Sequence, residues 1–121
     1  MAQVATEQYT REKSGIARLS LPQYFEFERP ADVLGYLADY PELSDLLEEI
    51  GSNLRTYFGT DSTPRLEVSN FGDEGPYLKA IMQWSGPISA ANAALAKFDN
   101  GYWLANCDRA AGRIIVDYQL V

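Results

Sequence analysis

The feature that most constrains the fold is one amphipathic segment bounded by two helix-ending residues. Apolar side chains recur at intervals of three and four residues from Leu43 to Phe58, which is the spacing of one face of an α-helix. Pro41 suits the first turn of a helix, and Gly59 suits the position after the last turn. We therefore predict a helix over residues 41–58. The residues expected on its buried face are Leu43, Leu46, Leu47, Ile50 and Leu54.

Such a helix is unstable alone in water, so the chain must provide an apolar surface that covers it. Apolar and polar residues alternate in residues 64–71, 78–84 and 114–120, as they do in strands with one buried face. The turn residues 72–76 predict an antiparallel hairpin between the first two strands. The residues expected to face the helix are Leu66, Val68, Met82, Trp84, Ile114 and Val116.

The remaining segments complete the element order. Pro30 predicts a short helix that ends before Pro41, and Pro87 predicts an alanine-rich helix with a kink at Gly101. Residues 19–28 alternate but contain a proline, so a strand and an extended arm both stay open. Residues 1–14 are polar and aperiodic and are expected to form a flexible arm, with a single domain over residues 15–121.

This order, (β)ααββαβ, predicts the α+β class. We expect a two-layer sandwich in which helices cover a small antiparallel or mixed sheet of three or four strands. If residues 19–28 form a true strand, the order approaches the ferredoxin-like arrangement. If they do not, the sheet has a free edge that a homo-oligomer would cover.

The absence of histidine is the main constraint on chemistry. The chain has no histidine and one cysteine, Cys107, which excludes histidine-dependent triads and zinc sites. We therefore expect no catalytic residue, no metal and no cofactor, and the sequence favours a non-enzymatic protein. The two carboxylate pairs that an enzyme could still use are Asp99 with Asp108, and Asp73 with Glu74.

Charge limits the partners. The net charge is −7, and residues 30–63 carry seven acidic side chains and one basic side chain. This balance predicts no binding to nucleic acid or to an acidic membrane, and it permits a neutral or basic protein partner. No apolar run is long enough to span a bilayer, and the first 15 residues show no leader pattern. Together with the lone cysteine, this predicts a cytoplasmic location.

Two groups of residues are candidates for partner binding. Glu42, Asp45 and Glu49 are three and four residues apart and therefore share one helix face. Tyr102 and Trp103 are adjacent aromatics of the kind that anchor interfaces. The alternatives are an ordinary solvated helix face for the acids and core positions for the aromatics, of which at most one is expected to be deeply buried.

A set of short motifs is spread over about residues 36–121. These motifs are Tyr40-Pro41-Glu42-Leu43, Leu46-Leu47, Arg55, Tyr57-Phe58-Gly59, Leu66-Glu67-Val68, Phe98-Asp99, Trp103-Leu104-Ala105-Asn106, Arg109-Ala110 and Gly112. In these motifs the chain resembles a family of small bacterial proteins that is frequent in cyanobacteria. Some members of that family are encoded beside PIN-domain ribonuclease toxins, so the resemblance implies an antitoxin-like or accessory role.

Two functional hypotheses follow from the sequence. The first is a non-enzymatic protein-interaction module, antitoxin-like or accessory to a nuclease toxin. The alternative is a small-ligand-binding domain with a pocket between the sheet and its helices.

Overall fold

The amphipathic segment forms the central helix α3, Leu43–Phe58, in a computed structural model that describes residues 21–59, 62–70 and 75–121. A turn of two residues precedes α3, and Gly59 follows it with a φ of 106°, a conformation that residues with a side chain avoid. The five residues predicted for the buried face are each at most 2% exposed. The helix and its buried face are confirmed.

The sheet has four strands in the order β1-β2-β3-β4: Glu26–Phe27, Arg65–Asn70, Pro76–Trp84 and Ile114–Leu120. The β2–β3 pair is antiparallel, whereas β1–β2 and β3–β4 are parallel. The mixed α+β sheet is confirmed. Of residues 21–28, the described part of the segment 19–28, only Glu26–Phe27 form a strand, and the strands follow one another in chain order. The interleaved ferredoxin-like arrangement is therefore not formed.

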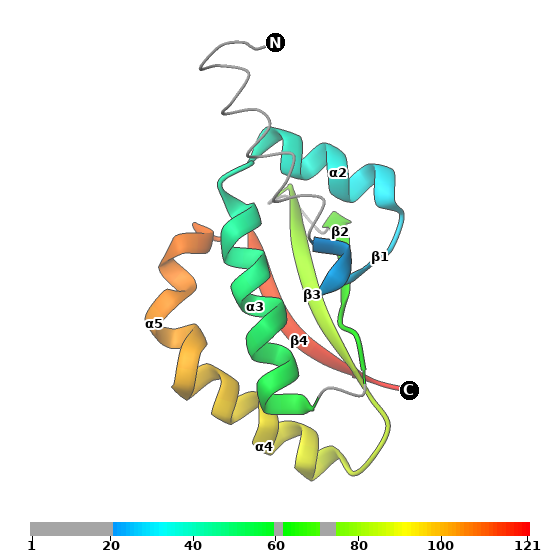
Figure 1. The fold of residues 1–121 in the computed structure, drawn as a ribbon, viewed down its shortest axis with the longest axis vertical. Coiled ribbons are helices and arrows are strands. Elements are labelled where there is room, and N and C mark those ends of the chain that lie inside the picture. Colours follow the sequence, from blue (N-terminus) through cyan, green and yellow to red (C-terminus); the bar gives the residue numbers. More distant parts are fainter. Residues whose placement is uncertain (1–20, 60–61, 71–74) are drawn as a thin grey trace.

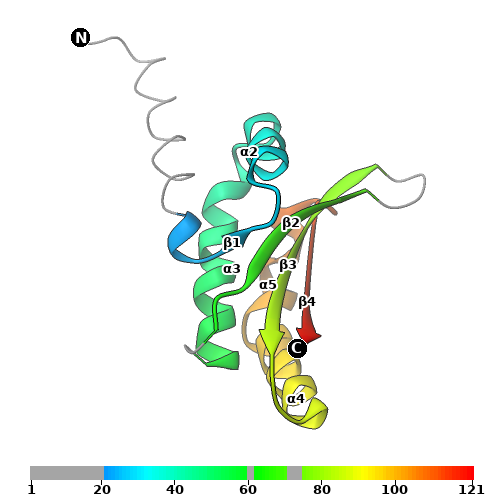
Figure 2. The same ribbon diagram turned by 90° about the vertical axis from the view of Figure 1, so that its right-hand side faces the viewer.

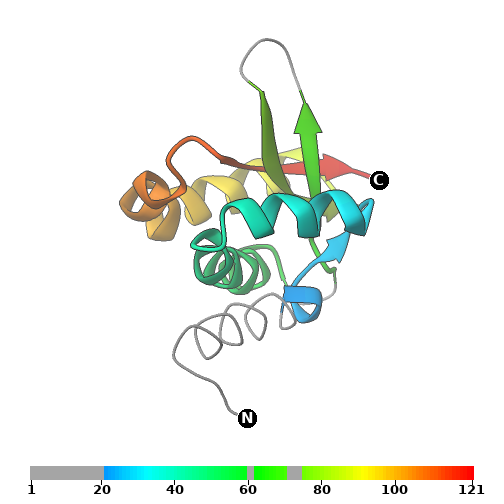
Figure 3. The same cartoon turned by 90° about the horizontal axis from the view of Figure 1, so that it is seen from above.

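The helices pack on one face of this sheet. In Figures 1 and 2, α3 lies along the strands, and no helix of the described residues covers the opposite face of β2 and β3. Helix α2, Pro30–Asp39, crosses the end of this layer, as Figure 3 shows from above. Helix α4, Ile88–Phe98, packs beside α3. None of the helices in the described ranges has the length and apolar character that crossing a bilayer requires.

The two faces of the sheet differ as the alternation predicts. On the helix side, Leu66, Met82 and Ile114 are buried, while Val68, Trp84 and Val116 pack against the core with part of their surface exposed. On the open side, the guanidinium of Arg65 contacts Glu67 at 3.2 Å and donates to Gln119 across β3 at 2.7 Å. The open face therefore carries polar side chains that pair with one another across the strands.

The last strand presents a charged edge. The backbone N–H of Tyr118 donates to the carboxylate of Asp117 at 2.8 Å, and Val121 N–H donates to Trp84 O in the ladder with β3. Ladder bonds alternate along a strand, so Tyr118 N–H lies on the outer side of β4. A carboxylate on an edge opposes pairing with another strand. Self-association through a sheet edge stays a prediction, and this edge works against it.

The predicted kink at Gly101 is a wider helical turn. Helix α4 continues into a π-helix, Asp99–Trp103, in which Leu104 N–H donates to Asp99 O, five residues earlier. The chain then runs through α5, Leu104–Asn106, and a 3-10 helix, Cys107–Ala110. At Gly101 a Cβ atom would lie 2.9 Å from the Tyr57 ring carbon Cζ, and closer still to its hydroxyl. Glycine is thus the residue that lets this turn pack on α3.

Some predictions fall on segments outside the described ranges. These are the N-terminal arm, residues 1–14, and the tip of the β2–β3 turn, which includes the Asp73–Glu74 carboxylate pair.

Truncation of the buried face of α3 tests the packing. Leu47 is fully buried, so Leu47→Ala is expected to lower the free energy of unfolding by about 2–5 kcal/mol. Ser52→Ala, on the exposed side of α3, is expected to leave stability unchanged or slightly raised. Urea titrations of both variants measure this difference, and equal losses would contradict the packing.

A pair of glycine substitutions tests the close approach at the π-helix. Gly101→Ala is expected to cost about 1–3 kcal/mol, because its Cβ meets the Tyr57 ring. Gly35→Ala in α2 has open space and is expected to gain up to about 1 kcal/mol. Adding Tyr57→Phe to Gly101→Ala removes the hydroxyl and should recover part of the loss. Thermal melts give the three comparisons, and a stabilised Gly101→Ala protein would refute the contact.

Candidate functional site

The acidic residues predicted for partner binding lie along α3, and the two aromatics lie in the π-helix. Glu42 and Asp45 are exposed, whereas Glu49 is half-buried. Tyr102 is buried, and Trp103 is half-buried with its ring stacked on Phe98 at a centroid distance of 6.3 Å. Only one of the adjacent aromatics is deeply buried, as the helical geometry predicts.

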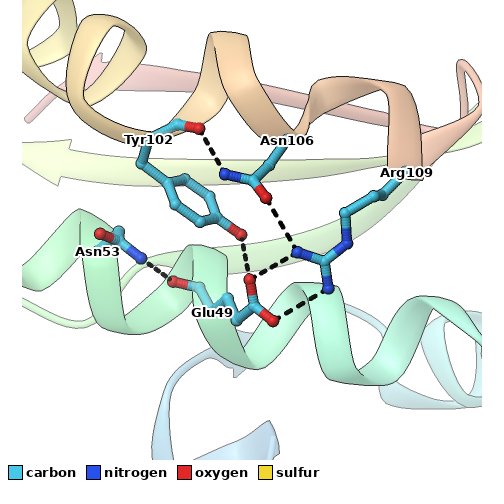
Figure 4. Close-up of polar contacts among 5 residues, drawn as sticks. All are labelled: Glu49, Asn53, Tyr102, Asn106 and Arg109. Atoms are coloured by element: carbon cyan, nitrogen blue, oxygen red, sulfur yellow. Dashed lines mark hydrogen bonds and ion pairs between the residues drawn. The ribbon is translucent and has the colours of Figure 1, made fainter.

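The structure brings Glu49 and Tyr102 together with Arg109, which was not among the predicted site residues. Arg109, in the 3-10 helix after α5, holds the Glu49 carboxylate with two N–H···O bonds of 2.7 and 2.9 Å. The Tyr102 hydroxyl donates to the same carboxylate at 2.9 Å (Figure 4). We call these three residues the Glu49 clamp. It joins α3 to the segment that follows α4.

Two asparagines hold the clamp in place. The Asn106 amide donates to Tyr102 O at 2.7 Å and accepts from the Arg109 guanidinium at 3.1 Å (Figure 4). It therefore links the guanidinium to the backbone of the π-helix. Asn53 donates to the backbone oxygen of Glu49 at 2.8 Å. The Glu49 carboxylate, the Tyr102 hydroxyl and the Arg109 guanidinium therefore each have a partner within the protein.

The charges in the clamp stabilise one another. The hydrogen bonds from Arg109 lower the pKa of Glu49, against a smaller opposing effect of burial. The same contact raises the pKa of Arg109, to which the charge of Asp45 also contributes. Burial, and then the bond to Glu49, raise the pKa of Tyr102. The ionised Glu49 with a neutral Tyr102 is thus the favoured state at neutral pH.

The pH dependence of stability tests the clamp. Glu49→Gln is expected to lower the free energy of unfolding by about 1 kcal/mol or less at neutral pH, because the pair is bidentate but partly exposed. The folded pKa of Glu49 lies below the ordinary 4.5, so the contribution is present above that value and is lost as pH falls through the folded pKa.

Urea unfolding of the parent and Glu49→Gln, from neutral to strongly acidic pH, measures this effect. The gap between the two proteins should close on acidification. Asp39→Asn is the control, because it removes an exposed carboxylate of α2 that is not part of the clamp. A gap that is constant with pH would argue against the clamp.

The clamp changes the partner-binding prediction. Glu49 and Tyr102 are engaged inside the protein, and the charge of Glu49 is neutralised by Arg109. Glu42 and Asp45 are the acids of the predicted set that stay exposed. That this face binds a partner stays a prediction, with a smaller set of residues to carry it.

A separate concave site lies between the end of α2 and the starts of β3 and β4, near the top of Figure 1. It encloses about 310 Å³. We call it the tyrosine–arginine pocket. Its lining residues are Tyr36, Tyr40, Gly75, Pro76, Tyr77, Ala111, Gly112 and Arg113.

The pocket is built from two tyrosines of one helix and one arginine of a turn. Tyr36 and Tyr40 are four residues apart on α2, with ring centroids 4.9 Å apart. The Arg113 guanidinium lies over the Tyr40 ring at 4.2 Å, which is a cation–π contact. Tyr36 donates its hydroxyl to Pro76 O at 3.2 Å, which ties α2 to β3. Burial and then the neighbouring Tyr40 raise the pKa of Tyr36.

None of the residues that line this pocket was among the predicted site residues. The spacing of Tyr36 and Tyr40 was a visible signal, since it places both rings on one helix face. The position of Arg113 was not, because it depends on a turn in which Ala111 and Gly112 have φ values of 52° and 77°.

The carboxylate pair Asp99 and Asp108, which the sequence offered for acid–base chemistry, lies away from the pocket. Burial raises the pKa of Asp99, whereas its proposed partner Asp108 is exposed, and neither carboxylate lines the pocket. Within the described ranges, no three side chains of the metal-binding types come together.

The chain matches no family of known proteins, no curated protein and no solved structure. The resemblance to the cyanobacterial family, and the toxin partner that it implies, therefore stay predictions. Function has to be argued from the geometry of the chain itself.

Proposed function

We propose that the chain is a non-enzymatic, small-ligand-binding domain whose site is the tyrosine–arginine pocket. The observation that carries this proposal is the Arg113 guanidinium held over Tyr40 at the wall of a cavity of about 310 Å³. Ligand sites are concave, lined by aromatic side chains and equipped with a few placed polar groups. The pocket has each of these properties.

The walls of the pocket are held by the fold. Tyr36 is buried and bonded to Pro76 O, and Leu78 N–H donates to Arg113 O at 2.8 Å, which anchors the turn to β3. A site with fixed walls loses little conformational freedom when a ligand enters. This supports a binding role for the pocket.

Protein interaction is the second candidate. Glu42 and Asp45 face solvent on α3, and Leu104, next to Trp103, is 66% exposed. An acidic surface with an exposed apolar residue suits a basic protein partner, including the antitoxin-like role that the family resemblance implies. We rank it second because Glu49 and Tyr102 are used inside the protein.

A fragment titration tests the proposal. The full-length ¹⁵N-labelled chain is titrated with a library of neutral, cationic and anionic fragments, and amide shifts are followed by NMR. Shifts are expected at Gly75, Tyr77, Ala111, Gly112 and Arg113. Tyr40→Leu should weaken them, because it removes the ring beneath the guanidinium.

Leu34→Ala is the matched control, because Leu34 lies on the same helix, is 43% exposed and does not line the pocket. It should leave the shifts unchanged. A library that moves no pocket amide, or that moves only α3 amides, would refute the proposal.

A further inference from the structure

We infer that the tyrosine–arginine pocket recognises an aromatic monocarboxylate, with the carboxylate on Arg113 and the ring against the tyrosines. This inference rests on the proposed function, because it names the ligand class of the same pocket. Three observations lead to it: the unused donors of Arg113, the aromatic walls and the single positive charge.

The Arg113 guanidinium has N–H donors that no described residue uses. The one hydrogen bond of the guanidinium to a described residue runs from Nη1 to Ala111 O at 3.4 Å, which is long. It forms no ion pair with a carboxylate in the described ranges, where Arg29, Arg65 and Arg109 each do. A guanidinium has five N–H donors. Because one face of this group lies on Tyr40, the donors along its edge remain available for a planar, bidentate acceptor.

The walls beside Arg113 suit a flat apolar group. Tyr36, Tyr40 and Tyr77 are among the residues that line the cavity, and the rings of Tyr36 and Tyr40 pack against each other next to Arg113. The hydroxyls of Tyr40 and Tyr77 have no hydrogen-bond partner in the described part of the chain. Aromatic rings pack against one another in tilted or offset arrangements. A ligand ring would therefore contact the tyrosines while its acidic group reaches Arg113.

The charge of the pocket favours a monoanion. Arg113 is the one charged residue among those lining the cavity, and the whole chain has a net charge of −7. A phosphate monoester carries about −1.5 to −2 charges at neutral pH. It would bring more negative charge than one guanidinium balances into an acidic protein. A carboxylate brings one charge and matches the planar guanidinium.

An NMR titration of the full-length chain separates these requirements. The probes are phenylacetate, acetate, which lacks the ring, 2-phenylethanol, which lacks the charge, and phenyl phosphate, which carries more charge. Phenylacetate is expected to shift the amides of Gly75, Tyr77 and Gly112. The other three probes should bind at least about tenfold more weakly, since each lacks one element of the match.

A peptide that ends in phenylalanine carries the same chemistry. N-acetyl-glycyl-phenylalanine therefore serves as a further arm of the titration. Binding tighter than that of phenylacetate would assign the site to peptide C-termini, and weaker binding would assign it to free aromatic acids. Either result supports recognition of an aromatic carboxylate.

Substitution of Arg113 tests the role of the guanidinium. Arg113→Gln is expected to lower phenylacetate affinity at least about tenfold, and Arg113→Lys to lower it less, because lysine keeps the charge but loses the paired donors. Arg29→Gln is the matched control. It makes the same change in net charge on α2 but removes an arginine that pairs with Asp32 outside the pocket, and it should bind as the parent does. Thermal melts establish that each variant is folded.

The outcomes separate this inference from the proposed function. Tight binding of 2-phenylethanol at the pocket, phenyl phosphate binding tighter than phenylacetate, or an unchanged affinity in Arg113→Gln would overturn the ligand class and leave the pocket as a binding site. If neither these probes nor the fragment library moves a pocket amide, the proposed function itself fails.

Discussion

The burial of the apolar stripe of α3 against one face of the sheet is the interaction on which the rest of the structure depends. The stripe, from Leu43 to Leu54, is almost entirely withdrawn from water, and the sheet residues beneath it are buried as well. Neither surface is stable in water without the other. The other two long helices pack around these surfaces. Helix α2 crosses the end of the layer, and α4 lies beside α3.

The two polar features of the structure depend on that arrangement. The Glu49 clamp fastens the segment after α4 to the outer side of α3. The tyrosine–arginine pocket forms where the end of α2 meets the starts of two strands. In the clamp, the guanidinium of Arg109 is already paired with a carboxylate of the protein. The pocket is open in the chemical sense, because its arginine keeps donors that no described residue uses. This contrast is why we place ligand binding at the pocket and a structural role at the clamp.

The sequence predicted most of the fold because its signals are local. Helix α3, the β2–β3 hairpin and strand β4 each show their periodicity within a short window. For residues 19–28 the sequence permits both a strand and an extended arm. In the described part of this segment, residues 21–28, only Glu26 and Phe27 form a strand, which pairs in parallel with β2. The ferredoxin-like alternative was wrong because strand order depends on pairing between distant segments.

The candidate site was harder to predict because it depends on contacts across the fold. Glu49 and Tyr102 were predicted as partner-binding residues, but Arg109, which binds the Glu49 carboxylate together with Tyr102, lies 60 residues from Glu49, and no spacing rule links them. The pocket depends on the positive φ values of Ala111 and Gly112, which turn Arg113 towards Tyr40. Such a turn does not show in hydrophobic periodicity.

The π-helix at Asp99–Trp103 also determines the direction in which the side chains of the following residues point. An α-helix rotates by about 100° per residue, so a turn with one additional residue changes the direction in which every later side chain points. Removal of one residue from this turn would restore ordinary helical bonding but would rotate Arg109 away from Glu49. It would also shift the turn that leads into β4, and with it Arg113. The single extra residue thus acts as a spacer that keeps Arg109 of the clamp and Arg113 of the pocket in position. Insertions or deletions in this turn should therefore be far less tolerated than substitutions.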